Sequence, residues 1–193
     1  MRSKAGSMRV ISGSAKHLPL KTIKGMDTRP TTDRIKETLF NMIQSDIPGC
    51  RFLDLFAGSG AIGIEALSRG AECAVFVEQN SAAAAVIRDN LAFTRLAERG
   101  RVIVRDVLHA GAELAGEQPF DVIFLDPPYR KDFEPPVLEM LLKNGLADEH
   151  SLIIIEAALD TEFSWLEAAG YELVKYKKYK TNAHVFVSPK SNI

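Results

Sequence analysis

Residues 51–63 read Arg-Phe-Leu-Asp-Leu-Phe-Ala-Gly-Ser-Gly-Ala-Ile-Gly, and this stretch decides the fold class. The apolar run 51–56 is typical of a short buried strand, and residues 57–63 predict a tight turn into a helix over 62–68. Three glycines in the turn have the G-x-G-x-x-G spacing of a strand-loop-helix site that binds nucleotides: Gly58, Gly60 and Gly63. This spacing is weak evidence by itself, so the ligand must be identified from the strands that follow.

Acidic residues end the next two predicted strands. The apolar run 74–77 ends in Glu78, 20 positions after Gly58, where a carboxylate can accept hydrogen bonds from two ribose hydroxyls. The run 101–105 ends in Asp106, which can contact an adenine amino group beside the ribose. We therefore predict a bound adenosine, held by Asp54, Phe56, Ala57, Gly58, Gly60, Gly63, Glu78, Asp106 and Val107.

A fourth apolar run, residues 122–125, leads into Asp126-Pro127-Pro128-Tyr129. The exocyclic amine of a nucleobase is a poor nucleophile, because its lone pair is delocalised into the ring. Acceptors in the plane of the amine return electron density to nitrogen, and the Asp126 carboxylate and the Pro127 carbonyl can each accept one N–H. Tyr129 can stack on the face of the base. The tetrad 126–129 is thus predicted to be the catalytic clamp of an amine-modifying enzyme.

The clamp also separates two possible cofactors. Nicotinamide dinucleotides and S-adenosylmethionine (SAM) both use a glycine-rich turn and an acid after the second strand. Only an amine methyltransferase needs the acid and aromatic residue of 126–129. Asp54 favours SAM over a dinucleotide. Its carboxylate would attract the sulfonium and the methionine amino group of SAM, whereas it would repel a pyrophosphate.

These motifs resemble a known family. Residues 54–63, Glu78, residues 105–106 and the tetrad 126–129 are similar to the successive motifs of class I SAM-dependent methyltransferases that act on amines. Residues 9–13 (Arg-Val-Ile-Ser-Gly) and 29–41 (Arg-Pro-Thr-Thr-Asp-Arg-Ile-Lys-Glu-Thr-Leu-Phe-Asn) resemble, more specifically, the RsmD family. The resemblance covers about residues 8–188. It implies methylation of N2 of a guanine, G966, in bacterial 16S rRNA, with SAM as the cofactor.

The charge is distributed unevenly along the chain. The net charge is −1, but residues 1–36 carry +7 and the remainder carries −8. We read residues 1–28 as a basic β-hairpin arm that tracks RNA phosphates, with residues 1–7 as a possible tag or extension. A second basic cluster with interleaved tyrosines occupies 175–180. The predicted RNA contacts are Arg9, Lys16, His17, Lys21, Lys24 and Arg29.

The segment 29–41 is predicted to begin a helix near Pro30. Its apolar face would comprise Ile35, Leu39, Met42 and Ile43 and would pack on the sheet. Free backbone N–H groups and the helix dipole at its start favour an anion. Arg34 and Thr31 are therefore predicted to help hold the methionine carboxylate of the cofactor, or a flanking RNA phosphate.

The rest of the chain predicts one doubly wound domain over residues 29–193. Helices over 81–97 and 133–143 alternate with strands, 152–156 is a fifth strand, and 172–179 and 183–188 can pair as a terminal hairpin. We therefore expect a Rossmann-like class I methyltransferase fold: an α/β domain with a mostly parallel seven-stranded sheet and helices on both faces.

Composition is consistent with this domain. The 193 residues are 46% hydrophobic, enough for a full core, and no apolar run approaches the roughly 20 residues that span a membrane. Cys50 and Cys73 lack metal-ligand spacing and are expected to be reduced thiols. We expect a cytoplasmic protein, monomeric, without a metal or a membrane partner. Its single short arm favours rRNA in a partly assembled small subunit as the substrate.

Other functions fit parts of the pattern. A methyltransferase of adenine N6, in DNA or RNA, would use the same clamp, and a methyltransferase of a glutamine amide would more typically have Asn in place of Asp126. A non-catalytic module that binds SAM or RNA would keep the fold without needing the clamp. A nicotinamide-dependent oxidoreductase lacks support, because no Tyr-Lys or His pairing of the catalytic kind is evident.

Overall fold

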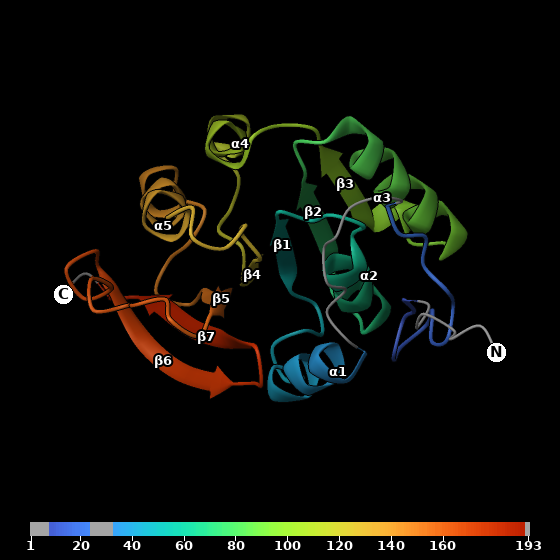
Figure 1. Ribbon diagram of the computed structural model, residues 1–193. Helices are drawn as coiled ribbons and strands as arrows, with labels where there is room; N and C mark the ends of the chain where they lie inside the picture. The colour runs from blue at the N-terminus through green and yellow to red at the C-terminus, as the bar shows by residue number, and fades with distance from the viewer. Residues whose placement is uncertain (1–7, 24–32, 192–193) are drawn as a thin grey trace.

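The computed structural model describes residues 8–23 and 33–191, and within them seven strands form one sheet (Figure 1). The strand order is β3-β2-β1-β4-β5-β7-β6; the pairs from β3 to β5 are parallel, whereas β7 is antiparallel to β5 and β6. The predicted mostly parallel sheet with a terminal hairpin is confirmed. Its strands are β1 Arg51–Leu55, β2 Cys73–Val77, β3 Gly100–Ile103, β4 Val122–Leu125, β5 Leu152–Ala158, β6 Tyr171–Lys178 and β7 Asn182–Pro189.

Helices cover both faces of this sheet (Figure 1). On one face α1, α2 and α3 share a core with alternate strand residues such as Phe52, Phe76 and Phe124, whereas α4 and α5 pack on the intervening residues, such as Leu53 and Ile123. Burial on both faces explains why the central strands are continuously apolar. In the described chain the α-helices are α1 Asp33–Met42, α2 Ala61–Ser68, α3 Ser81–Phe93, α4 Val107–Leu114 and α5 Glu134–Lys143, and a short 3-10 turn spans Ala97–Arg99.

The strand register aligns the residues that follow the central strands. Leu55, the last residue of β1, pairs with Val77 of β2 on one side and with Leu125 of β4 on the other. Leu125 in turn pairs with Ile155 of β5. The order of strands reverses at β1, so the crevice where open α/β sheets bind ligands lies beyond these carboxyl ends.

Two helices differ from the sequence prediction. Helix α3 ends at Phe93 rather than near residue 97, because Thr94 closes it and Arg95 adopts a left-handed φ of 60°. Helix α4 was not predicted at all. Its start carries a recognisable signal, since Asp106 caps it and Val107, Ala110, Gly111 and Leu114 follow at helical spacing on its buried side.

Helix α1 buries most of the predicted face, together with a lysine that the prediction left out. Leu39 and Ile43 are in the core as expected, but Ile35 is only half-buried, and Lys36 is buried instead with 1% of its surface exposed. The predicted face did not include Lys36, because a lysine is not expected in the core. The buried lysine is possible because it forms an ion pair with Glu65 of α2, at 3.6 Å. The predicted start of the helix near Pro30 lies outside the described residues.

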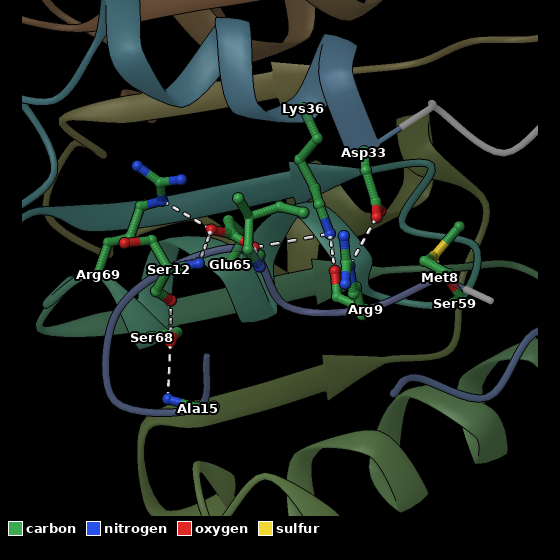
Figure 2. Close-up of polar contacts among 12 residues, drawn as sticks. Met8, Arg9, Ser12, Ala15, Asp33, Lys36, Ser59, Glu65, Ser68 and Arg69 are labelled. Carbon is green, nitrogen blue, oxygen red and sulfur yellow. Dashed lines mark hydrogen bonds and ion pairs between the residues drawn. The ribbon is translucent and has the colours of Figure 1, made fainter. Parts of the chain in front are cut away.

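The first described segment, residues 8–23, folds back on itself and packs against α2 (Figure 2). The backbone N–H of Val10 donates to the Leu18 carbonyl at 3.0 Å, which closes a short paired turn. Val10, Ala15 and Leu20 are buried in the core beside α1 and α2. The expected hairpin is therefore a short turn that shares the core of the sheet.

Candidate active site

The glycine turn between β1 and α2 requires its glycines for two different reasons. Gly58 and Gly60 have left-handed φ values of 56° and 77°, which residues with a Cβ rarely adopt. At Gly63 the reason is space, since an added Cβ would lie 2.4 Å from Cε1 of Phe76. At Gly58 a Cβ would meet nothing within 4 Å, so the backbone there borders open space that a ligand can approach closely.

Two of the predicted acids hold this turn in place. The Glu78 carboxylate accepts hydrogen bonds from the backbone N–H of Gly58 and of Asn80, both at 2.8 Å. Asp54 is buried and accepts from the N–H of Gly63 at 2.9 Å. Burial raises the pKa of Asp54 to about 7; the bond from Gly63 opposes this, and the negative charge of Glu78 adds to it. A nearby cation would favour the carboxylate again.

Asp106 and Val107 lie at the junction of β3 and α4. The Asp106 carboxylate caps α4 by accepting from the Leu108 N–H at 3.0 Å and lies 3.2 Å from Nδ1 of His109. Val107, the first residue of α4, is buried. Phe56, which has a left-handed φ of 63°, makes an edge-to-face contact with Phe133, their ring centroids 5.3 Å apart. Contact with a cofactor stays a prediction for Asp106, Val107 and Phe56.

The tetrad 126–129 leaves the end of β4 beside the glycine turn. Pro127 is buried, whereas Asp126 and Tyr129 are exposed toward solvent. Desolvation by the surrounding protein, followed by the negative charges of Glu156 and Asp54, raises the pKa of Asp126 well above its usual range.

The structure adds a polar network that the sequence analysis did not identify. The Tyr129 hydroxyl donates to Oε1 of Glu156 at 3.3 Å, and Nδ2 of Asn182 donates to the same oxygen at 2.6 Å. On the other oxygen, Nε2 of His184 lies 3.4 Å from Oε2, while Nδ1 of His184 is 3.2 Å from the Tyr179 hydroxyl. Glu156 ends an apolar run just as Glu78 and Asp106 do, which was the signal available for it.

The predicted RNA contacts are distributed over the surface of the described chain. Arg9 forms an exposed ion pair with Asp33 at 2.9 Å, and Lys21 forms one with Asp89 at 2.8 Å. Lys16 and His17 are exposed on the turn of the 8–23 segment, and Arg34 is exposed in the first turn of α1. The predicted RNA contacts Lys24 and Arg29, and Thr31, which was predicted to help hold the cofactor, lie outside the described residues.

The second basic cluster lies on β6, the edge strand of the sheet. After Tyr171 every residue of β6 is exposed, including Lys175, Lys177, Lys178 and Tyr176. In Figure 1 this strand projects beyond the helical layers. A hollow of about 390 Å³ next to it, lined by Met42, His150 and Leu152 among others, is at the amino ends of the parallel strands, away from the candidate site.

No group of three or more His, Cys, Asp or Glu side chains within 8–23 and 33–191 is arranged to hold a metal ion. Over the same ranges, no helix combines the length and the apolar character needed to cross a membrane.

The strand order, the glycine turn and the acid-ended strands define the Rossmann-like fold of the class I methyltransferases. The solved structure of yhhF from Escherichia coli superposes with a TM-score of 0.82 and 34% identity, covering 97% of this chain and 100% of that chain. The solved structure of HI0767 from Haemophilus influenzae gives a TM-score of 0.79 at 30% identity, over 96% of this chain and 100% of that one.

The family follows from sequence comparison. The family model described as "Conserved hypothetical protein 95" matches residues 8–188. Ribosomal RNA small subunit methyltransferase D of E. coli is 36% identical over 82% of this chain and 78% of its own length, and YlbH of Bacillus subtilis is 42% identical over 89% and 92%. The chain belongs to this family, the RsmD family that its motifs predicted.

Proposed function

We propose that this protein transfers a methyl group from SAM to N2 of a guanine in 16S rRNA, at the position called G966, as a step in maturation of the small ribosomal subunit. The observation that carries the proposal is the clamp: Asp126 and Pro127 leave β4 directly beside the glycine turn that follows β1. Support for an RNA substrate comes from the relatives named ribosomal RNA small subunit methyltransferase D.

The residues around the turn suit SAM. Gly58 leaves its backbone open to a ligand, Glu78 still has acceptor capacity for the ribose hydroxyls, and Asp106 lies one strand further on for the adenine. Asp54 would serve the methionine end, where a cation would counter its desolvation. When bound, SAM supplies the methyl group: the amine nitrogen bonds the methyl carbon while the carbon–sulfur bond breaks, and its electron pair stays on sulfur.

The clamp would raise the reactivity of the amine chiefly by position. Asp126 accepts one amine hydrogen and the Pro127 carbonyl accepts the other, so electron density returns to N2. The Tyr129 ring stacks on the base and holds N2 in line with the methyl group. Asp126 need not take the proton, because the methylated nitrogen is acidic enough to release it to water.

The proposed substrate is rRNA within a partly assembled small subunit, bound by a monomer in the cytoplasm. The described part of the basic segment is short and packed on α2, so it offers little RNA surface by itself. The exposed lysines of β6 provide a second contact. Choosing one guanine from such limited contacts favours a folded particle over free RNA.

The test is transfer of labelled methyl from SAM to small subunits from cells that lack the gene, followed by nucleoside analysis. N2-methylguanosine at one site is the expected product. N6-methyladenosine would instead favour the adenine alternative, and absence of transfer would favour a binding module.

The role of the clamp is tested with Asp126→Ala. We expect transfer to fall by at least about a hundredfold, because an acceptor used in the transition state is lost, while SAM binding stays nearly intact. Asp160→Ala is the matched control, because Asp160 is an exposed acid whose partner is Arg130, outside the clamp. Retained turnover in Asp126→Ala would refute the assigned role.

A further inference from the structure

Glu156 is the neighbour of the clamp across the sheet. The pairing of Leu125 with Ile155 places Asp126, which directly follows β4, next to Glu156, which lies two residues before the end of β5. Strand alternation puts both side chains on the face of Phe124 and Ile154. The charge of Glu156 is also one of the causes that raise the pKa of Asp126. The two carboxylates therefore border one space.

The antiparallel return of β7 completes this corner. Glu156 pairs with His184, and Ala158 pairs with Asn182, so the two β7 side chains lie on the Glu156 face of the sheet. Glu156 has 6% of its surface exposed and Asn182 has 3%. Burying the Glu156 carboxylate and its polar partners carries a desolvation cost that lowers the stability of the fold. This cost indicates that the network serves the candidate active site and not stability.

Asn182 gives an independent sign of an absent ligand. Its Nδ2 donates to Glu156, but its Oδ1 is buried without a hydrogen-bond partner in the described part of the chain. Buried acceptors in folded proteins are nearly always paired, since an unpaired one retains its desolvation penalty. An N–H group brought in by a ligand would relieve that penalty.

We propose that Glu156 and Asn182 form a subsite that reads the Watson–Crick edge of the target guanine, with the Glu156 carboxylate accepting the N1–H while Asp126 accepts from the N2 amine. This inference rests on the proposed function and extends it to the choice of base. The Tyr129 hydroxyl occupies Oε1 of Glu156 in the structure. It releases that oxygen when the ring turns to stack on the base.

The hydrogen-bonding pattern explains why this subsite selects guanine. The edge of guanine presents three hydrogens: the one on N1 is shared by the Glu156 carboxylate and Oδ1 of Asn182, and the two on N2 are accepted by Asp126 and the Pro127 carbonyl. Adenine presents two hydrogens on N6, but its N1 is an acceptor. A lone pair facing the Glu156 carboxylate repels it and leaves both groups unpaired, and such mismatches are rejected strongly.

The experiment uses 2,6-diaminopurine, which keeps the 2-amino group and carries no hydrogen on N1. Small-subunit RNA is ligated from two fragments with guanosine or 2,6-diaminopurine riboside at the target, and is assembled with small-subunit proteins. The measured quantity is the ratio of kcat/KM for the two particles. For the unaltered protein we expect guanosine to be preferred by about a hundredfold or more.

Glu156→Gln tests the reading directly, because a glutamine amide can donate an N–H to an unprotonated N1. We expect the preference for guanosine to fall by about tenfold or more, or to invert, whatever happens to the absolute rate. Tyr179→Phe is the matched control within the network: it removes the contact with His184 but touches no base. It should change both rates equally and leave the ratio unchanged.

Two results would overturn the inference. One is a Glu156→Gln protein that loses rate equally on both particles, which is what a purely structural role predicts. The other needs no variant and so does not depend on folding: an unaltered protein that methylates diaminopurine as fast as guanosine. Failure of the proposed function is distinct from both, because the unaltered protein would then form no N2-methylguanosine on the guanosine particle.

Discussion

Glu65 of α2 joins three parts of the chain, and its replacement by glutamine tests how the amino-terminal segment is held (Figure 2). The carboxylate has no exposed surface. It accepts the backbone N–H groups of Ile11 at 2.7 Å and Ser12 at 3.0 Å. It also pairs with Arg69 at 2.7 Å and with Lys36 at 3.6 Å. Glu65→Gln keeps the shape but removes the negative charge.

The cost follows from what the change leaves behind. Lys36, whose Nζ donates to the Arg9 carbonyl at 2.5 Å, would remain buried without an anion. Burial already lowers the pKa of Lys36, and the charge of Glu65 is the largest effect that opposes this lowering. One of the two backbone N–H groups also loses its acceptor, because a glutamine has one oxygen. Breaking a buried ion pair from one side costs about 3–5 kcal/mol, so we expect Glu65→Gln to lower the free energy of unfolding by about 3 kcal/mol.

The assay is urea unfolding at neutral pH for four proteins: unaltered, Glu65→Gln, Lys36→Met and the double variant. The double variant should lose less than the two single losses combined, by about 1–3 kcal/mol, because it no longer leaves the Lys36 ammonium buried beside an uncharged side chain. Glu72→Gln, which changes an exposed glutamate in the loop between α2 and β2, is the control and should change stability by less than about 0.5 kcal/mol. A loss below about 1 kcal/mol for Glu65→Gln, or strict additivity, would refute the reasoning.

Three further predictions concern the candidate site. Gly63→Ala should lower the free energy of unfolding by about 1–3 kcal/mol by pushing on Phe76, and adding Phe76→Leu should restore part of the loss in urea unfolding. Asp54 has its pKa raised from 3.8 to about 7, so the folded state binds more protons than the unfolded state between these values and stability falls as pH rises through that window. Asp54→Asn should remove this fall, of the order of 4 kcal/mol, between pH 4 and 7; an unchanged slope would contradict the assignment. Arg34→Ala should weaken SAM binding or RNA binding by about threefold to tenfold in calorimetry and filter binding, and unchanged affinity for both would end that hypothesis.

Much of the fold could be predicted because its signals are local. The apolar runs before Glu78 and Asp126 are strands in the structure, and the glycine turn at 57–63 leads into α2 as its spacing indicated. The hairpin of β6 and β7 was also visible in the sequence. Each of these depends on residues only a few positions apart, where backbone preference and alternation are sufficient evidence.

Other features depend on partners far away in the sequence. Lys36 can be buried because it pairs with Glu65, which lies beside it in space although it is 29 positions further along the chain. No periodicity within α1 reveals such a partner. Helix α4 was not predicted for a different reason: the helix has only eight residues and is moderately apolar. In that case the local signal was present but weak, and packing against α5 decides the outcome.

The sequence by itself determined the class of fold, the glycine turn, the family and the clamp at 126–129, because each is encoded in contiguous residues. Only the tertiary structure decided that Glu156, Asn182, His184 and Tyr179 form one polar network beside that clamp. The parallel register of β4 with β5 brings Glu156 next to Asp126, and the antiparallel return of β7 adds the other residues. Strand pairing creates such neighbours across gaps in the sequence that carry no spacing signal, so their chemistry appears only when the sheet is assembled.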